Sequence, residues 1–518
     1  MPRPMPRLTP RPQGPLTPRP QGSSHPARRR LRAGLLSLSL LVAGAPSVAL
    51  AGTAAPASRV ELPRTDFPLG PPGLADQTHT AVAPGIDLFT LVHGSATDGY
   101  TVSVLMKGKD YGTRAQAEAA AESVRAAGFE VSVQQFTRPE VADYPASIGY
   151  MVRTGLWTVK ERKEADKVVK QLKEAGVTAK VDFLGDDGVQ STGPWDVRVL
   201  TIDPRDFRGS YHSSVGVNVA KQERPSAMAK QAKAIAAVNG GFFNIHTDKH
   251  LRGEPVGISV VDGRLLSEAV PGRSALILKG RSARITEVST SVTATSADGE
   301  RTGITGVNRA SKPDELILYT EEFGADTPAD DGAEAVLDAN GQVLELRPAG
   351  GPVQPGTRVL HGTGIMSDWI WSHAWEQWTL DITSKVTDLR SGKSIPLTPE
   401  TSIIGGGVGL VRDGTEHVTA KADGHANVNM ILRRHPRTLA GVTKSGRLIL
   451  AVVDGRKPGV TVGASMVEAA QLMLWLGARQ AINLDGGGSS AMVVNGKVVN
   501  HPSDGTERGV GDALLVTP

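Results

Sequence analysis

The sequence predicts an α+β protein in which a small two-layer region precedes a larger, mixed α/β and strand-rich one. Between residues 98 and 186, strand-like and helix-like stretches follow one another in the order β-α-β-β-α-β. From Trp195 onward, short strand-like stretches and turns dominate, and few segments have helical spacing. The length of 518 residues is sufficient for more than one folded domain.

The composition argues against several functional classes. The net charge is +4, but residues 1–32 contain many arginines and no acidic residue, so the remainder is mildly acidic. No nucleic-acid-binding function is therefore expected. The chain has no cysteine, which excludes disulfides, thiol catalysis and zinc–thiolate sites. An exported protein without cysteine fits a bacterial cell envelope.

The N-terminal residues have the pattern of an export signal. Residues 1–27 are rich in Pro and Arg, residues 28–32 are basic, and residues 33–50 are apolar. Ala49-Leu50-Ala51 matches a small-residue cleavage site. Residues 1–51 are therefore expected to be a signal peptide with a Pro/Arg-rich extension, with an uncleaved anchor helix as the alternative. No later segment is expected to cross a membrane, so the mature protein should be secreted or associated with the cell wall.

Residues 52–97 are expected to be a Pro/Ala/Gly-rich linker, with one short strand as an open alternative, and residues 98–186 a separate domain. Strands are predicted at 100–106, 129–136, 149–154 and 177–183, and helices at 113–127 and 160–175. Thr113 is suited to cap the first helix, and Gly128 and Gly176 are suited to end the two helices.

This order of elements, with its two similar halves, resembles the SPOR domain, a family of peptidoglycan-binding modules. The resemblance implies a ferredoxin-like fold for residues 98–186. It also implies that peptidoglycan glycan strands bind to the face of its sheet. A spacer and a propeptide-like inhibitory domain are the alternatives.

The larger region, residues 195–518, contains one strong amphipathic helix at 466–476, ended by Gly477 and flanked by strands at 448–453 and 480–484. Residues 263–392 form many short strand-like stretches. Near their end lie four tryptophans, which suggest either a packed hydrophobic flap or a sugar-stacking platform; they are Trp369, Trp371, Trp375 and Trp378.

A carboxylate followed by three glycines and two serines is the clearest candidate for a functional site. Asp485 comes directly after the apolar stretch 478–484, and Gly486, Gly487 and Gly488 follow it. Glycines allow the backbone to turn sharply and bring its N–H groups close to a ligand. Ser489 and Ser490 add hydroxyl donors. A glycine-rich hairpin with a capping Asp is the structural alternative.

Four further motifs contain residues suited to hold a sugar or a phosphate. An Asn-Gly-Gly turn follows a small-residue strand, an Arg follows His435-Pro436, an Asp-Gly-Arg follows a strand, and a polar segment ends with Glu507-Arg508. An Arg side chain presents a planar fork that matches phosphate oxygens. The structural alternatives are turns and ion pairs. The residues concerned are Asn239, Gly240, Gly241, Arg437, Thr438, Asp454, Arg456 and Arg508.

These motifs occur in the same order as in the phosphodiester glycosidase family, which residues 195–518 resemble. The resemblance implies hydrolysis of a sugar–phosphate diester at the glycosidic C–O bond, which yields a free sugar and a phosphomonoester. Animal members carry cysteine-rich modules that this chain lacks. This difference favours a substrate in the bacterial cell envelope.

Roles can be assigned within that chemistry as hypotheses. We expect Asp485 to act as nucleophile or base, Glu468 as a second carboxylate and Arg437 on the phosphate, with Arg508 as an alternative. No cofactor and no metal are expected, because no His/Asp spacing matches a ligand set; a metal at Asp485, Asp454 or Asp504 is the open alternative. His246 and His250 are expected to be loop residues. The substrate-binding residues would be Asn239, Gly240, Gly241, Thr438, Gly486, Gly487, Gly488, Ser489, Ser490, Asp454, Arg456 and Arg508.

Two other functions remain open from the sequence. One is a phosphodiesterase or phosphatase that cuts the P–O bond. The other is a non-catalytic protein that binds peptidoglycan or another glycan. Acid and hydroxyl residues in glycine-rich loops favour an enzyme, because glycan binders depend more on aromatic side chains.

Overall fold

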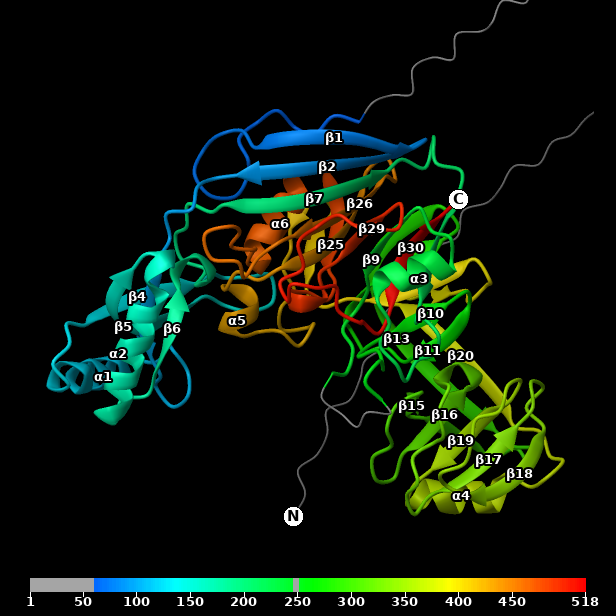
Figure 1. Ribbon diagram of the computed structural model, residues 1–518. Helices are drawn as coiled ribbons and strands as arrows, with labels where there is room; N and C mark the ends of the chain where they lie inside the picture. Colours follow the sequence, from blue (N-terminus) through cyan, green and yellow to red (C-terminus); the bar gives the residue numbers. More distant parts are fainter. Residues whose placement is uncertain (1–59, 246–250) are drawn as a thin grey trace, which may run out of the picture. The chain divides into compact units, whose positions relative to one another are not determined.

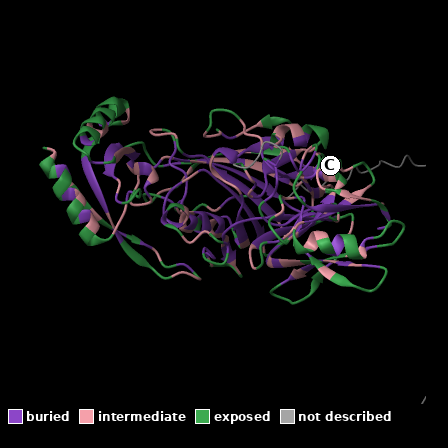
Figure 2. Ribbon diagram, turned by 90° about the horizontal axis from the view of Figure 1, so that it is seen from below, coloured by how far each residue is buried: buried purple, intermediate pink, exposed green. Residues whose placement is uncertain are grey.

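The computed structural model describes residues 60–245 and 251–518, which all belong to one compact unit. The predicted signal peptide and the residues His246 and His250 lie outside the described residues. No helix in the described part of the chain is long and apolar enough to cross a membrane. Strands dominate, and Figure 2 shows that buried residues are concentrated in them. The α+β class predicted from the sequence is confirmed.

Residues 98–186, here called the small domain, have the predicted order of elements. Its strands form an antiparallel sheet in the order β4-β5-β3-β6, which is the arrangement of a split βαβ unit. Thr113 caps the first helix through a capping box, and Gly128 and Gly176 adopt positive φ just beyond the two helices. The elements are β3 (Tyr100–Val104), α1 (Arg114–Ala126), β4 (Ser132–Arg138), β5 (Ser147–Trp157), α2 (Arg162–Glu174) and β6 (Ala179–Phe183).

The expected linker contains two strands, so that part of the prediction is wrong. β1 (Asp76–Ala83) and β2 (Ile86–His93) form a hairpin, and β2 pairs with β7 (Trp195–Ile202) over its full length (Figure 1). β1 lies at the edge of the sheet and is mostly exposed, so its sequence is polar and gives little signal of a strand. The hairpin extends the main sheet of the larger domain.

The main sheet has eight antiparallel strands in the order β1-β2-β7-β26-β25-β27-β23-β24. Its central strands are almost wholly buried. The helix α6 (Met466–Trp475) packs on one face through Ala469, Leu472 and Met473. The remaining strands are β23 (Gly409–Arg412), β24 (Thr415–Glu416), β25 (Arg437–Thr443), β26 (Leu448–Val453) and β27 (Ala478–Asn483).

The other face of the main sheet shares a core with two further sheets. Leu450 and Ile482 from the main sheet meet Val238 and Leu514 from a five-stranded sheet in the order β29-β28-β9-β30-β8. This core places the end of β9 near the ends of β25 and β27. The elements of the five-stranded sheet are β8 (Ser210–Ser214), α3 (Pro225–Gln231), β9 (Ala236–Asn239), β28 (Met492–Val494), β29 (Lys497–Val498) and β30 (Ala513–Thr517).

The third partner of this core is a second large sheet in the order β11-β10-β22-β12-β13-β20-β21, with β14 beside β13. Its strands are β10 (Ser259–Val261), β11 (Arg264–Ser267), β12 (Ser274–Lys279), β13 (Ser282–Thr295), β14 (Arg301–Ile304), β20 (Asp381–Asp388), β21 (Ser394–Ile395) and β22 (Thr401–Gly405).

Residues 306–380, here called the inserted unit, leave this second large sheet after β14 and return to it at β20. Their sheet has the order β15-β16-β19-β17-β18. The elements are β15 (Gly306–Val307), β16 (Leu316–Thr320), β17 (Ala333–Leu337), β18 (Val343–Pro348), β19 (Arg358–Gly362) and α4 (Ile365–His373).

The helix-free face of the small domain's sheet is covered. Phe136 and Met151 on this face pack against Val428 and Leu432, at and just beyond the short helix α5 (Val428–Ile431). The buried Arg433 also pairs with Asp110 of the small domain at 2.5 Å. The face to which the sequence assigns glycan strands is therefore occupied by the chain itself.

Candidate active site

The predicted motifs meet at the ends of three strands, and the Asn239 side chain links them. Its Nδ2 donates to the Asp485 carbonyl oxygen (2.8 Å), and its Oδ1 accepts from the Thr438 hydroxyl (2.7 Å) and the Ala491 N–H (3.1 Å). Asn239 and Thr438 are fully buried. Both side chains therefore fix the backbone of the site, and their hydrogen-bonding groups are engaged before any substrate binds.

The glycine-rich loop allows several groups to approach its backbone closely. Gly487 has a φ of +61° and begins a single 3-10 turn, and its N–H donates to the Pro436 carbonyl oxygen at 2.9 Å. A Cβ on Gly487 would lie 3.0 Å from the Arg456 guanidinium, and a Cβ on Gly488 would collide with the Arg508 guanidinium. The missing side chains thus let two cations reach the loop that carries Asp485.

Asp485 is a partly buried carboxylate beside these cations. One of its oxygens accepts from the Gly486 N–H at 2.8 Å. Burial raises the pKa of Asp485 to about 6, and the Ser489 hydroxyl, the Gly486 N–H, Arg508 and Arg456 act in the lowering direction. The carboxylate is therefore ionised at neutral pH but is easily protonated, as a nucleophile or base at this position requires.

The serine hydroxyls of the loop have no hydrogen-bond partner. Ser489 and Ser490 are both buried, and neither Oγ forms a hydrogen bond in the described structure. The Ser489 hydroxyl lies near enough to Asp485 to lower the pKa of that carboxyl group, but its Oγ is not in hydrogen-bonding geometry with it. Buried polar atoms without partners are rare, so they are candidates to contact a bound ligand.

Asp512 is a second buried carboxylate that the sequence did not identify. It accepts from the Gly241 N–H at 2.7 Å, while the Asp485 N–H donates to the Gly240 carbonyl oxygen at 3.0 Å. The Asn-Gly-Gly turn thus joins the two acids. Burial, with the negative charge of Asp485 as a further raising cause, raises the pKa of Asp512 to about 7. The only signal for it in the sequence is an isolated Asp before the last strand.

Arg456 and His435 lie at the exposed side of the loop. Arg456 has a φ of +57° and is exposed, and its Nη2 lies 3.2 Å from the His435 Nδ1. Burial and the cations Arg437 and Arg456 lower the pKa of His435 to about 3, so its ring is neutral. The Asn429 carbonyl oxygen, 3.1 Å from Nε2, requires the proton on that nitrogen and leaves Nδ1 as the acceptor.

The two other predicted arginines are held more firmly. Arg437 is almost fully buried, and its Nε and Nη2 donate to the carbonyl oxygens of Ala464 and Met430. Burial lowers the pKa of Arg437 to about 9, and Arg456 acts in the same direction. Arg508 pairs with Asp504 at 2.5 Å. Among the three, Arg456 has the most donor groups without a partner.

Glu468 is engaged in contacts within the protein, and its predicted role as a second catalytic carboxylate stays a prediction. Both of its oxygens accept from the Arg434 Nε at 2.9 and 3.0 Å, and one also accepts from the Ser465 N–H in the capping box of α6. Arg434 in turn donates to the carbonyl oxygens of Gly185 and Val189. Glu468 therefore anchors the end of the small domain to α6, and Asp512 is the acid that lies beside Asp485.

Asp454 also has partners within the protein. It accepts from the Asn500 side chain at 2.9 Å and from the His501 N–H at 2.8 Å. Asp454, Asp196 and His501 offer possible metal-ligand atoms within 4.8 Å of one another. However, Arg198 pairs with Asp196, and Asn500 and His501 engage Asp454. The cluster is thus explained by its own hydrogen bonds.

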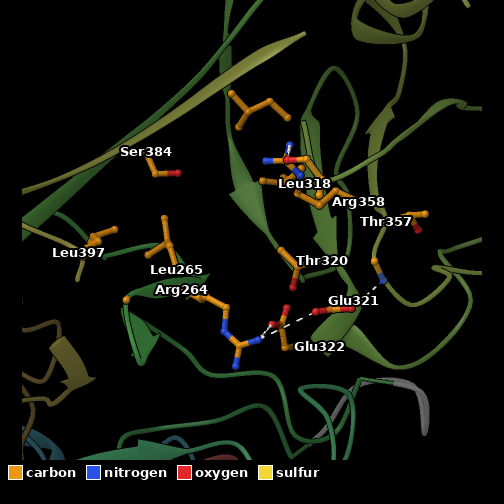
Figure 3. A pocket seen from close by; sticks show the side chains of 14 residues that line it. Arg264, Leu265, Leu318, Thr320, Glu321, Glu322, Thr357, Arg358, Ser384 and Leu397 are labelled. Carbon is orange, nitrogen blue, oxygen red and sulfur yellow. Dashed lines mark hydrogen bonds and ion pairs between the residues drawn. The ribbon is translucent and has the colours of Figure 1, made fainter. Parts of the chain in front are cut away.

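The structure also has a cavity away from these residues. It has a volume of about 370 Å³ and lies between the second large sheet and the inserted unit (Figure 3). Arg264, paired with Glu322 at 2.5 Å, and Arg358 are among its lining residues. None of the predicted site residues lines it. The candidate site is therefore defined by the loop around Asp485.

Comparisons with known proteins match the C-terminal part of the chain to a known family. The family model for phosphodiester glycosidases matches residues 332–517, which include the loop around Asp485 but not Asn239. The N-acetylglucosamine-1-phosphodiester alpha-N-acetylglucosaminidase of Bos taurus is 33% identical over 117 residues, which cover 20% of this chain and 21% of the bovine protein. An uncharacterized SPbeta prophage-derived protein of Bacillus subtilis is 38% identical over 111 residues, which cover 21% of this chain and 16% of that protein. The chain thus spans about a fifth of the length of these curated relatives.

A solved structure matches most of the chain. It is that of a presumed exported protein from Burkholderia pseudomallei, with 30% sequence identity and a TM-score of 0.79. The match covers 89% of this chain and 100% of that one. A protein from Synechocystis with 17% identity and a TM-score of 0.53 shares the fold over 86% of this chain.

Proposed function

We propose that this chain, whose residues 332–517 match the phosphodiester glycosidase family model, hydrolyses the glycosidic C–O bond of a sugar–phosphate diester. Water would add to the anomeric carbon, and the phosphomonoester would leave with the electrons of the broken C–O bond. A phosphomonoester is a good leaving group, so the reaction depends less on a general acid than the hydrolysis of an ordinary glycoside.

The observation that carries this proposal is the Asp485 carboxylate on a glycine-rich loop that two guanidinium groups approach. The carboxylate, with a pKa of about 6, would attack the anomeric carbon or activate the water. Arg456 and Arg508 would bind the phosphate together with the N–H groups of the loop. The substrate and the leaving group both carry negative charge, so cations at this position would assist binding and departure.

The pair of acids fits an anionic substrate. As the pH rises, Asp485 ionises first, with a pKa of about 6, and its charge contributes to the higher pKa of Asp512, about 7. Between these values the pair carries about one negative charge. We infer that a protonated Asp512 limits the repulsion of the phosphate while it holds the Gly241 N–H in place. The role of Arg437 would then be to hold the 430–437 segment under the site.

We propose further that the protein acts outside the cytoplasm, on a phosphodiester of a cell-envelope polysaccharide. The signal-like N-terminus supports this location, as does the similarity to a presumed exported protein. Peptidoglycan binding by residues 98–186 stays a prediction. Because α5 and Leu432 cover the sheet face, such binding would need another surface or a displacement of this segment.

The proposal is tested by a screen of the purified protein on glycosyl-1-phosphodiesters with different sugars and aglycones. The expected result is release of free sugar and a new phosphomonoester in equal amounts, from at least one substrate. An Asp485→Asn variant serves as the matched control for a contaminating enzyme. Absence of turnover on every diester, together with retention on denuded peptidoglycan, would support the non-catalytic alternative.

A further inference from the structure

Three of the four clustered tryptophans lie at the surface of the inserted unit. Trp369 is 9% exposed and packs in the core with Ile370, whereas Trp371, Trp375 and Trp378 are 46%, 53% and 37% exposed. A packed hydrophobic flap thus accounts for Trp369 alone. Large aromatic side chains that the core does not need, gathered within eight residues, mark a candidate binding surface.

The turn that carries Trp375 and Trp378 is rigidly held. The Trp378 N–H donates to the Trp375 carbonyl oxygen at 3.0 Å, and Gln377 between them has a φ of +67°. Two backbone hydrogen bonds of 2.8 Å join Gln377 and Trp378 to Val343 at the start of β18. A non-glycine residue keeps a left-handed backbone only where its surroundings fix it. The backbone positions from which the two tryptophans project are therefore fixed by the fold.

The rings of Trp375 and Trp378 are neighbours, tilted against each other, and both residues are exposed. Their centroids lie 6.5 Å apart with an angle of 52° between the planes. The Trp375 ring N–H donates to the Ser372 carbonyl oxygen at 2.9 Å, which fixes that ring. With its N–H engaged, the Trp375 indole offers a ligand its apolar face.

The charged residues of the segment that carries the rings bear on the charge of a ligand. Residues 365–381 contain no Lys or Arg, and their exposed charged side chains are Asp368, Glu376 and Asp381. This segment therefore offers no cation to an anionic lipid surface or a phosphate-rich polymer. Glu376 and Gln377, which separate the two tryptophans, supply hydrogen-bonding groups. Apolar ring faces next to neutral and acidic acceptors suit the C–H face and the hydroxyls of an uncharged sugar.

We propose that Trp375 and Trp378 form a platform that binds an uncharged polysaccharide chain. The platform belongs to the inserted unit, and none of its residues takes part in the candidate active site. It would hold a polymer to the protein independently of the hydrolysis of any phosphodiester. The binding is therefore testable without knowledge of the enzyme's substrate.

The test is electrophoresis of the full chain in native gels that contain dextran, laminarin, hydroxyethyl cellulose or galactomannan. At least one polysaccharide should slow the wild-type protein. A W375A/W378A variant should bind that polysaccharide at least about ten-fold more weakly. Ile365→Ala is the matched control, because Ile365 is 62% exposed on the same unit but is not aromatic. Both changes are at exposed positions, and thermal unfolding checks that each variant is folded.

Three outcomes would overturn the proposal. They are unchanged wild-type mobility with every polysaccharide, equal retardation of the W375A/W378A variant, and a tryptophan-dependent interaction of another kind. The last would be sedimentation with phosphatidylglycerol vesicles or dimerisation in analytical ultracentrifugation that the double variant loses. Hydrolysis of a small soluble phosphodiester should be equal in all variants. A failure of the platform is thereby distinguished from a failure of the proposed activity.

Discussion

Replacing Asp485 with Asn should abolish most of the activity without loss of stability. Burial raises the pKa of Asp485 from 3.8 to about 6. The folded protein therefore binds this proton more tightly than the unfolded chain, and its stability falls as the pH rises from about 4 to about 6. At pH 7 the difference corresponds to at most about 3 kcal/mol of destabilisation.

Asparagine keeps an oxygen for the Gly486 N–H and removes the buried charge, so Asp485→Asn should be as stable as the wild type at pH 7 or more stable by up to about 3 kcal/mol. The loss of a nucleophile or base should lower kcat/KM by about 10²- to 10⁴-fold. Hydrolysis of a glycosyl-1-phosphodiester and thermal unfolding measure the two effects in one preparation. Asp76→Asn, on the exposed edge strand β1, is the control.

The reasoning would be refuted by an Asp485→Asn variant that keeps activity within about ten-fold of the wild type. It would also be refuted by a variant that is clearly less stable at pH 7, because its lost activity would then reflect a damaged fold. A variant that is inactive and stable is the expected result. At pH 4, where the carboxyl group of the wild type is protonated, the stability advantage of the variant should disappear.

Three further changes separate the roles of the residues around Asp485. The kcat/KM of the wild type should rise with pH through about 6, as Asp485 ionises, and fall above about 7, as Asp512 ionises. The Asp512→Asn variant should lose only the fall at high pH. A fall that persists in this variant would contradict the role of Asp512. Arg456→Ala should raise KM about ten- to 150-fold, because a charge-assisted contact with the phosphate is lost. The control is Arg205→Ala, which should leave KM unchanged; Arg205 pairs with Asp203 in the turn after β7. Equal KM values in the two variants would exclude Arg456 as a phosphate ligand. Glu468→Gln should keep kcat/KM within about three-fold of the wild type. It should lower the free energy of unfolding, measured in urea, by about 1–3 kcal/mol, because the ion pair with Arg434 is lost while the helix cap is kept. A large loss of activity at full stability would instead support a catalytic role for Glu468.

Elements with strong local signals could be predicted from the sequence. The helix α6 begins and ends within a residue of its predicted bounds, because Ser465 caps its start and Gly477 ends it with a positive φ. The order of elements in residues 98–186 is also as predicted, since Thr113 caps the first helix and a glycine with positive φ follows each of the two helices. Such signals depend on residues a few positions apart, so they can be recognised before the chain is folded.

The features that could not be predicted from the sequence depend on tertiary contacts. β1 has little apolar periodicity because it is an exposed edge strand that depends on β2 for pairing. Glu468 could not be assigned to Arg434, which is 34 residues away in the sequence. Asp512 is one of many isolated acids until the sheet brings it to the Asn-Gly-Gly turn. The contact of Asn239 with substrate stays a prediction, whereas the hydrogen bonds by which its amide joins Asp485, Thr438 and Ala491 could not be read from the sequence.

The bond broken in the proposed reaction can be determined from hydrolysis in water enriched in heavy oxygen. If Asp485 and its neighbours act on the anomeric carbon, the heavy oxygen should appear in the released sugar and be absent from the phosphomonoester. Mass spectrometry of both products after a single turnover distinguishes the two positions. Label in the phosphomonoester would show that the P–O bond is cut and would contradict the glycosidase mechanism.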